Sequence, residues 1–445
     1  MLTEIETIPQ NHQPAVAVRQ AALAQRPEFQ TVTMMGLGYI GLPTAAVIAS
    51  RGIEVVGVDV KEEIVNKIAS GHIHIYEPDL DGLVQKVVSS GTFVARMEPA
   101  ESDVFIIAVP TPVGELKNPV LDYVIEATRK ISPVLRPGNL VILESTSPVG
   151  TTEMIANLLA ESRPDLKLPT RDVVGPDINI AYCPERVLPG RILSELVNND
   201  RCIGGITMAC GRRAQRFYKK FVRGACIVTS ARTAEIVKLT ENAFRDANIA
   251  FANELSMICD KLAINVWDVI DLANRHPRVN ILKPGPGVGG HCIAVDPWLI
   301  VHSAPELANV IRTARQTNDK KARYTVETAA ALIDDHPYAQ VACFGLAFKA
   351  NVDDLRESPA LEVAIALGEK YGSRIKVVEP HIKALPEALA ATGAEFLGLD
   401  EALAACEVGV VLVDHDEFRG VPTGARRHMA LLDTRGIWRD SGWIT

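Results

Sequence analysis

One cysteine stands in an unusual local sequence, and the chemistry of the chain is easiest to read there. Cys292 follows the glycine-rich run PGPGVGG and precedes a carboxylate, Asp296, by four residues. A thiolate is a strong nucleophile, and a nearby carboxylate can orient or deprotonate water. The glycines would let the backbone approach a substrate closely. The segment therefore predicts covalent catalysis by Cys292, and the alternative is an incidental thiol in a structural turn.

A second set of polar residues recurs at helical spacing upstream of the thiol. Lys238, Asn242 and Arg245 stand at i, i+4 and i+7, so a helix places them on one face. The apolar neighbours Phe244 and Phe251 predict that this helix is largely buried. In that setting Lys238 suits general acid–base chemistry, and near a thiol its charge would favour the thiolate. The alternative is an ordinary solvated stripe of polar residues.

A glycine pattern near residue 36 predicts a bound dinucleotide. Gly36, Gly38 and Gly41 form G-x-G-x-x-G between an apolar strand and a helix, and Asp59 ends the next strand. In this context the glycines allow a pyrophosphate to sit at the helix N-terminus. Asp59 would accept hydrogen bonds from the adenosine ribose and repel a 2′-phosphate, which favours NAD over NADP. A glycine turn without a ligand is the alternative.

The elements that must hold these residues follow from the apolar periodicity. Between residues 31 and 228 apolar strands alternate with helices, which predicts a doubly wound parallel sheet. From about Thr229 the pattern is that of one long helix followed by shorter ones, and near residue 340 the strands return. We predict an α/β fold with two Rossmann-like doubly wound parallel-sheet domains joined by a helical connector. The predicted parts are a polar N-terminal extension (1–30), an NAD-binding Rossmann domain (31–228), a helical connector and dimerisation domain (229–325) and a second Rossmann-like domain (326–445).

Composition excludes several other classes of protein. The 445 residues carry a net charge of −8 without a basic block, so nucleic acid is not an expected partner. No apolar run reaches the roughly 18 to 20 residues that span a bilayer, and the N-terminus lacks the features of a secretory signal. The eight cysteines include no CxxC pair, so we expect no metal site and reduced thiols in the cytoplasm. The connector helix, rich in Ala, Ile, Phe and Leu, is expected to pair two copies into a homodimer.

Six segments together resemble the UDP-glucose/GDP-mannose dehydrogenase family. They are GLGYIGLP, ESTSPVGTT, CPERVLPG, KLTENAFRDANIAFANE, GVGGHCIAVDP and FGLAFKANVDDLRESPA, and the resemblance covers the chain after about residue 30. It implies an enzyme that oxidises a nucleotide-sugar alcohol to the acid with two NAD, and a second Rossmann-like domain that binds the UDP-sugar. Ile-Ala-Val-Asp follows Cys292 where UDP-glucose enzymes usually have Phe-Pro-Lys-Asp. The resemblance therefore implies a UDP-N-acetylhexosamine, with the manno epimer favoured over the gluco epimer by resemblance alone.

The implied reaction gives each catalytic candidate a role. An aldehyde donates a hydride readily only after a nucleophile has added, so Cys292 would form a thiohemiacetal and then a thioester. Lys238 would act as acid and base at the sugar alcohol and stabilise the developing oxyanion, with Asn242 orienting that oxygen. The resemblance assigns Asp296 and Glu185 to the positioning or deprotonation of water.

The remaining candidates belong to the cofactor or to the substrate. Thr111 and Thr146 end later strands, where ligands of such sheets bind, although both could be ordinary turn residues. Tyr39 and Ile40 lie in the glycine turn, and Arg435 is a further candidate for the cofactor side. The resemblance places the following residues at the substrate, with surface salt bridges as the alternative for the basic ones: Arg186, Val187, Arg245, His276, Arg278, Gly289, Phe348, Lys349 and Arg356. In relatives, the loop that matches His276 and Arg278 can reach the active site of a partner subunit.

Two other classes of function remain open from the residues alone. A two-electron hydroxy-acid dehydrogenase would use Lys238 and Asn242 and leave Cys292 idle. A non-catalytic NAD-binding protein would bind the cofactor without turnover. The first of these predicts that turnover is insensitive to alkylation of the thiol.

Overall fold

The protein forms two compact units. The structure, a computed structural model, describes residues 28–114, 117–170, 173, 175–188, 190–290 and 292–439, so the N-terminal extension lies almost wholly outside the described residues. The first unit extends to Ala234. The second contains Glu235–Thr445 together with two short segments, 112–120 and 146–149, that the chain contributes from within the first.

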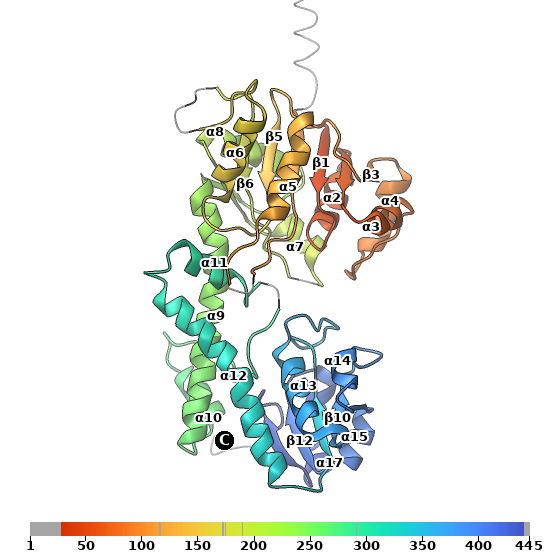
Figure 1. Ribbon diagram of the computed structural model, residues 1–445, viewed down its shortest axis with the longest axis vertical. Helices are drawn as coiled ribbons and strands as arrows, with labels where there is room; N and C mark the ends of the chain where they lie inside the picture. The colour runs from red at the N-terminus through yellow and green to blue at the C-terminus, as the bar shows by residue number, and fades with distance from the viewer. Residues whose placement is uncertain are drawn as a thin grey trace, which may run out of the picture. The chain divides into compact units, whose positions relative to one another are not determined.

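The first unit is an eight-stranded sheet with a hydrophobic core on each face. In β4, Val104 and Ile106 pack into one core while Phe105 and Ile107 pack into the other. Burial on both faces explains why such strands read as continuous apolar runs. Figure 1 shows α5 and α6 lying over one face of this sheet. In spatial order β3-β2-β1-β4-β5-β6-β7-β8, the strands are β1 (Thr31–Met35), β2 (Glu54–Val58), β3 (Phe93–Arg96), β4 (Val104–Ile107), β5 (Leu140–Leu143), β6 (Asn179–Tyr182), β7 (Arg201–Gly205) and β8 (Cys226–Ser230). The helices are α2 (Gly41–Ala49), α3 (Glu62–Ala69), α4 (Leu80–Ser89), α5 (Asp122–Ile131), α6 (Thr151–Ser162), α7 (Ile192–Asn198) and α8 (Met208–Tyr218).

One strand pair departs from the parallel arrangement. β7 runs antiparallel to β6, with Ala181 opposite Gly205 and Tyr182 opposite Gly204. The other six strand pairs among the described strands of this sheet are parallel. The antiparallel pair brings the residues that follow β6 alongside those that begin β7.

The second unit combines long helices with a five-stranded parallel sheet. In β9, Val341 and Cys343 pack into one core while Ala342 and Phe344 pack into the other, so this smaller sheet is also covered on both faces. The helices outside the sheet are α9 (Ala231–Lys261), α10 (Val266–Ala273), α11 (Asp296–Ser303) and α12 (Asn309–Asp334). The strands, ordered β11-β10-β9-β12-β13, are β9 (Val341–Phe344), β10 (Ile375–Val378), β11 (Glu395–Phe396), β12 (Val408–Val411) and β13 (Ala430–Asp433). Their helices are α13 (Pro359–Tyr371), α14 (Glu387–Ala390), α15 (Leu399–Ala405), α16 (Asp416–Arg419) and α17 (Thr423–Arg426).

The long helix α9 is less buried than its sequence suggested. Phe244 is 70% exposed and Phe251 is 56% exposed, so the prediction that these residues bury the helix is wrong for the single chain. With Ile258, which is 49% exposed, they recur every seven residues and form one apolar stripe. The face of α9 that carries Lys238 and Arg245 is unevenly covered, because Lys238 is only 8% exposed whereas Arg245 is exposed. Although α9 and α12 are long, no helix of the described residues has the apolar run that crossing a membrane requires.

Candidate active site

The glycine turn after β1 has the geometry of a dinucleotide site. Gly36 has a φ of 94°, and its N–H donates to Val58 O at 2.8 Å. A Cβ on Gly36 would lie 2.5 Å from Ala108 O, and one on Gly41 would lie 1.9 Å from Gly36 O. No described atom lies within 4 Å of a Cβ built on Gly38. The first and third glycines are therefore required by the turn itself, whereas the second leaves open space beside the start of α2.

Asp59 is held beside this turn at the end of β2. Its Oδ2 accepts the N–H of Leu37 at 3.1 Å and its Oδ1 accepts the N–H of Lys61 at 3.0 Å. These bonds fix the carboxylate and leave lone pairs for further donors. Tyr39 is 39% exposed and Ile40 is the residue that precedes α2. The open Gly38 and the anchored Asp59 fit the pyrophosphate and adenosine ribose of NAD.

A similar glycine turn follows β9 in the second sheet, but the carboxylate beside it, Glu379, already accepts hydrogen bonds from the protein. Gly345 has a φ of 93°, and Leu346 N–H donates to Glu379 Oε2 at 2.7 Å. The same oxygen also accepts the N–H of Ala347 and lies 3.1 Å from His415 Nε2. Burial opposes ionisation of Glu379, but these hydrogen bonds outweigh it and lower its pKa. The second turn therefore lacks a carboxylate that is open to a ribose.

The catalytic candidates of the second unit lie together. Lys238 and Asn242 are one turn apart on α9, and Asn242 Nδ2 donates to Asp296 Oδ2 at 2.5 Å. Asp296 is the first residue of α11, and its N–H donates to Cys292 O at 2.9 Å. A carboxylate in the first turn of a helix is stabilised by the helix dipole. Lys238 and Asp296 are both buried, and their charges act on each other and on the thiol of Cys292.

Burial dominates the electrostatics of this cluster. It raises the pKa of Asp296 to about 6, although the charge of Lys238 and the Asn242 hydrogen bond both oppose the rise. Part of Cys292 is exposed, yet enough protein surrounds the thiol that desolvation raises its pKa, and the charge of Asp296 adds to the effect. Lys238 favours the thiolate, as expected, and so does Arg356, but burial and the charge of Asp296 outweigh them. The resting thiol is therefore protonated, and its addition to a carbonyl needs a proton acceptor.

The glycines before Cys292 pack against the protein itself. A Cβ on Gly289 would lie 2.1 Å from Glu357 O and 2.6 Å from a carbon of Pro359. Gly290, with a φ of 84°, would place a Cβ 3.0 Å from the ring of Phe348. The close backbone approach that we expected toward a substrate is, at these two positions, an approach to the segment before α13. The loop of residues 284–295, which carries Cys292 and which we call the thiol loop, therefore packs at Gly289 and Gly290 against the connection between β9 and α13.

Glu185 lies in the first unit and is firmly held there. Its Oε2 is paired with Arg201 Nη1, and its Oε1 accepts the N–H of Arg186 at 2.7 Å. Both side chains of the ion pair are nearly inaccessible. Arg201 was not among the predicted site residues, because its pairing depends on the antiparallel register of β6 and β7. The structure thus adds Arg201 to the candidate site.

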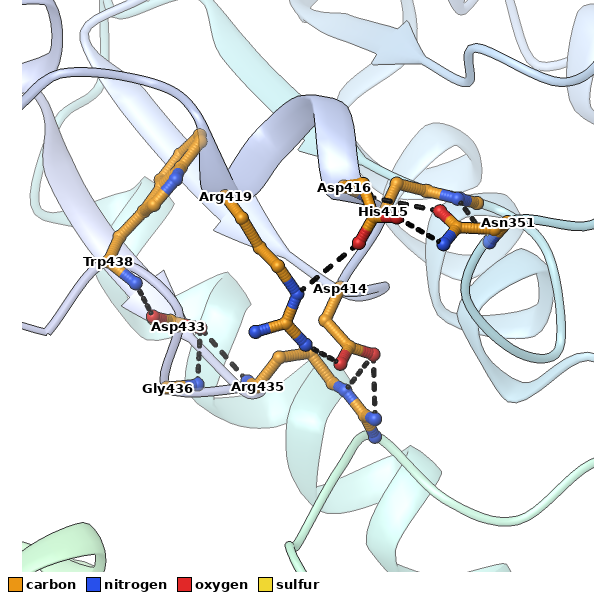
Figure 2. A network of polar contacts seen from close by, with 9 residues as sticks. All are labelled: Asn351, Asp414, His415, Asp416, Arg419, Asp433, Arg435, Gly436 and Trp438. Atoms are coloured by element: carbon orange, nitrogen blue, oxygen red, sulfur yellow. Dashed lines mark hydrogen bonds and ion pairs between the residues drawn. The ribbon is translucent and has the colours of Figure 1, made fainter.

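The other predicted residues occupy varied positions. Arg435 Nη2 is 2.7 Å from Asp414 Oδ1, in the network drawn in Figure 2. The ammonium of Lys349 lies over the ring of Phe348, 5.6 Å from its centroid, and Arg356 is paired with Asp354. Of the remaining candidates, Thr111 is in the first unit and Thr146 in the second, Val187 packs against the first unit's core, and Arg245, His276 and Arg278 are exposed.

One cluster has the composition of a metal site but not the free ligands. Ligand atoms of His381, His415 and Glu417 lie within 4.8 Å of one another. However, His415 Nδ1 accepts the N–H of Asn351 at 3.0 Å, so its Nε2 carries the proton and donates to Glu379. Figure 2 shows Asn351 beside His415. With both ring nitrogens engaged, His415 is not available to a metal ion.

Comparison with known proteins identifies three successive family domains. The NAD binding domain of the UDP-glucose/GDP-mannose dehydrogenase family matches residues 30–222. The central domain of that family matches residues 232–320, and its UDP binding domain matches residues 342–440.

Relatives resemble the chain over nearly its whole length. It is 56% identical over 411 residues to an NDP-N-acetyl-D-galactosaminuronic acid dehydrogenase of Ralstonia nicotianae, which covers 92% of this chain and 97% of the relative. It is 57% identical over 393 residues to a UDP-N-acetyl-D-mannosamine dehydrogenase of Campylobacter jejuni, which covers 88% and 97%. The structure of a UDP-D-ManNAc dehydrogenase from Pyrococcus horikoshii has a TM-score of 0.81 and 37% identity, and covers 93% of this chain and 97% of that one.

Proposed function

The chain belongs to the UDP-glucose/GDP-mannose dehydrogenase family, and from this premise we propose that it oxidises UDP-N-acetyl-D-mannosamine at C6 to UDP-N-acetyl-D-mannosaminuronate. The oxidation removes four electrons and consumes two NAD, and the product would supply surface polysaccharide synthesis. The observation that carries the proposal is the cluster of the second unit, in which Asn242 is bonded to Asp296 and Asp296 to the backbone of Cys292.

The residues of this cluster divide the first half of the reaction between them. Bound NAD supplies the hydride acceptor for both oxidations. Lys238 takes the proton of the C6 hydroxyl and stabilises the oxygen as its negative charge develops. Asn242 donates one amide hydrogen to Asp296, and its second amide hydrogen can orient the C6 oxygen of the sugar. The product of this half-reaction is an aldehyde.

The thiol makes the second oxidation possible. Cys292 Sγ adds to the aldehyde carbon, a C–S bond forms, and the thiol proton passes to a base. We assign this role to Asp296, because its charge already acts on the thiol and raises the pKa of that group. Loss of the second hydride leaves a thioester. Water then attacks the thioester, releasing the acid and regenerating the thiol. Once Asp296 has released the thiol proton to solvent, it can accept the proton of that water and pass it to the departing sulfur of Cys292. The family resemblance assigns Glu185 to orienting the water.

The identity of the sugar is the part of the proposal that most needs a direct test. One relative is named for a mannosamine substrate and another for a galactosaminuronic acid product, so the N-acetylgalactosamine epimer is a second candidate. The purified protein should be offered NAD with UDP-N-acetyl-D-mannosamine, its gluco and galacto epimers, and UDP-glucose. We expect the highest kcat/KM for the manno sugar and two NADH per sugar consumed. A higher kcat/KM for another epimer would make that epimer the proposed substrate. One NADH formed per sugar consumed would contradict the four-electron reaction.

We also propose that the protein is a homodimer formed through α9. The exposed stripe of Phe244, Phe251 and Ile258 repeats every seven residues, which is the spacing that helices use to pair. Such a run of large apolar side chains is costly to leave in water. Pairing of two copies would cover it.

A further inference from the structure

A chain of buried side chains links α9 to the loop that carries Cys292. Arg315 Nη1 of α12 donates to Asp246 Oδ1 of α9 at 2.6 Å, and Asn318 Nδ2 donates to the same oxygen at 2.8 Å. Asn253 Nδ2 then donates to Asn318 Oδ1 at 2.9 Å, and Gly285 N–H donates to Asn253 Oδ1 at 2.9 Å. All four side chains are at most 1% exposed. We call Asp246, Asn318 and Asn253 the amide relay.

The two ends of the relay determine how each amide is oriented. An ionised carboxylate only accepts hydrogen bonds, so Asn318 must present its NH₂ group to Asp246. The amide oxygen of Asn318 therefore faces Asn253, and Asn253 must donate to it from its own NH₂ group. The oxygen of Asn253 is left facing Gly285, whose backbone N–H can only donate. Donors and acceptors thus alternate without conflict from Asp246 to the loop, which assigns each amide orientation by chemistry rather than by shape.

The thiol loop is held by α9 at both of its ends. Asn253 holds Gly285 at the start of the loop, and Asn242 holds Asp296 at its end. The two asparagines are 11 residues apart on one helix, or about 16 Å along its axis at 1.5 Å per residue. Cys292 lies between these two anchors, and Lys238 lies one turn before Asn242 on the same helix. α9 therefore holds both ends of the loop that carries the sulfur, while Gly289 and Gly290 in between pack against the segment before α13.

We propose that Asn253 is a positioning residue of the active site, which acts through the backbone of the thiol loop and holds Cys292 where it captures the aldehyde. Asn253 itself touches neither the thiol nor any catalytic candidate among the described residues. The hydrogen-bond partners of its side chain among the described residues are Gly285 of the loop and Asn318. Without the relay, the glycines that follow residue 284 would let the start of the loop move, because glycine restricts the backbone least. The proposal rests on the proposed function for its effect on turnover.

The test compares Asn253→Ala with Asn248→Ala. Asn248 lies on the same helix, but its amide donates only to Phe244 O in the backbone, so its removal leaves the thiol loop intact. For Asn253→Ala we expect kcat to fall at least tenfold, the KM for NAD to stay within twofold, and aldehyde to become trappable by hydroxylamine. The alkylation rate of Cys292 by iodoacetamide should also change, with a shifted pH midpoint. Asn248→Ala should match the parent in all four measurements.

Two readouts separate failure of the relay from failure of the proposed function. Thiol alkylation needs no sugar, so a parent protein that fails to oxidise any UDP-sugar would refute the function while still testing the relay. If Asn253→Ala folds and matches Asn248→Ala in kcat and alkylation, the proposal is overturned. If Asn253→Ala does not fold, hydrogen exchange of the parent decides, because the relay requires the Gly285 amide to be protected. Fast exchange at Gly285 would then overturn the proposal.

Discussion

Replacing Asp296 with asparagine should stabilise the protein at neutral pH while it destroys the activity. Burial raises the pKa of Asp296 from 3.8 to about 6, so the folded protein binds this proton more tightly than the unfolded chain does. Below about pH 4 both states are protonated, and the carboxyl carries no penalty. As the pH rises from 4 to 6 the folded state must ionise a buried group, and stability is lost. Above pH 6 the full penalty remains.

The size of this penalty follows from the shift. About two pKa units correspond to roughly 3 kcal/mol, and about half of this loss falls between pH 5 and pH 8. Asp296→Asn keeps an oxygen for the Asn242 amide but has no charge to bury. Its stability gain over the parent should therefore be larger at pH 8 than at pH 5, by ~3–6 °C in melting temperature for a unit of about 200 residues.

Differential scanning fluorimetry of both proteins at pH 5 and pH 8 measures this difference. Asp334→Asn is the matched control, because the pKa of that exposed carboxyl is lowered by Tyr371 and Lys370. Its replacement should give no gain that grows with pH. A melting-temperature difference for Asp296→Asn that is the same at both pH values would refute the reasoning that burial raises this pKa.

Four further predictions follow from the described contacts. Cys292→Ala should abolish acid formation, measured by product chromatography, and leave NAD binding within twofold, measured by fluorescence titration. Iodoacetamide alkylation of Cys292 should rise with pH toward a midpoint above the ordinary thiol value, and Asp296→Asn should lower that midpoint because one of its causes is removed. Asp59→Asn should raise kcat/KM for NADP relative to NAD at least tenfold, because the charge that repels a 2′-phosphate is gone; an unchanged ratio would place the ribose elsewhere. Phe251→Glu should shift the protein from dimer to monomer in sedimentation velocity, whereas a dimer that persists would move the interface away from α9.

The sequence predicted those features that depend on local pattern. The strand, glycine turn and acidic residue around Gly36 occur as expected because each requirement is met within the 29 consecutive residues from Thr31 to Asp59. The strand β3 was not predicted, because it is a short edge strand in which buried and exposed residues alternate. β7 and β8 were not predicted either, since arginine, glycine, threonine and serine interrupt their apolar residues. These strands are specified by their neighbours in the sheet, which the local sequence does not reveal.

The candidate site shows the same division. Lys238 and Asn242 could be placed together because one helix fixes their spacing, but their relation to Cys292 depends on packing between α9 and the loop before α11. Helix burial was misjudged at Phe244, because an apolar residue looks the same in a sequence whether it faces a core or the surface of the single chain. Local periodicity therefore predicts which residues share a face, and packing decides what covers it.

The ion pair between Arg201 and Glu185 depends on the register of β6 and β7, which the local sequence does not reveal. The antiparallel pairing of β6 and β7, extended by three residues beyond Tyr182, places Glu185 opposite Arg201 at the start of β7, and the two are indeed paired. A parallel β7 would have placed its first residue alongside the start of β6 instead. The same guanidinium lies over the ring of Tyr218, whose hydroxyl donates to Glu144 at 2.6 Å. Burial raises the pKa of Glu144 to about 7, against the charge of Arg201. One arginine thus faces two buried carboxyls and forms its ion pair with Glu185, and this pairing exists because β7 runs antiparallel to β6.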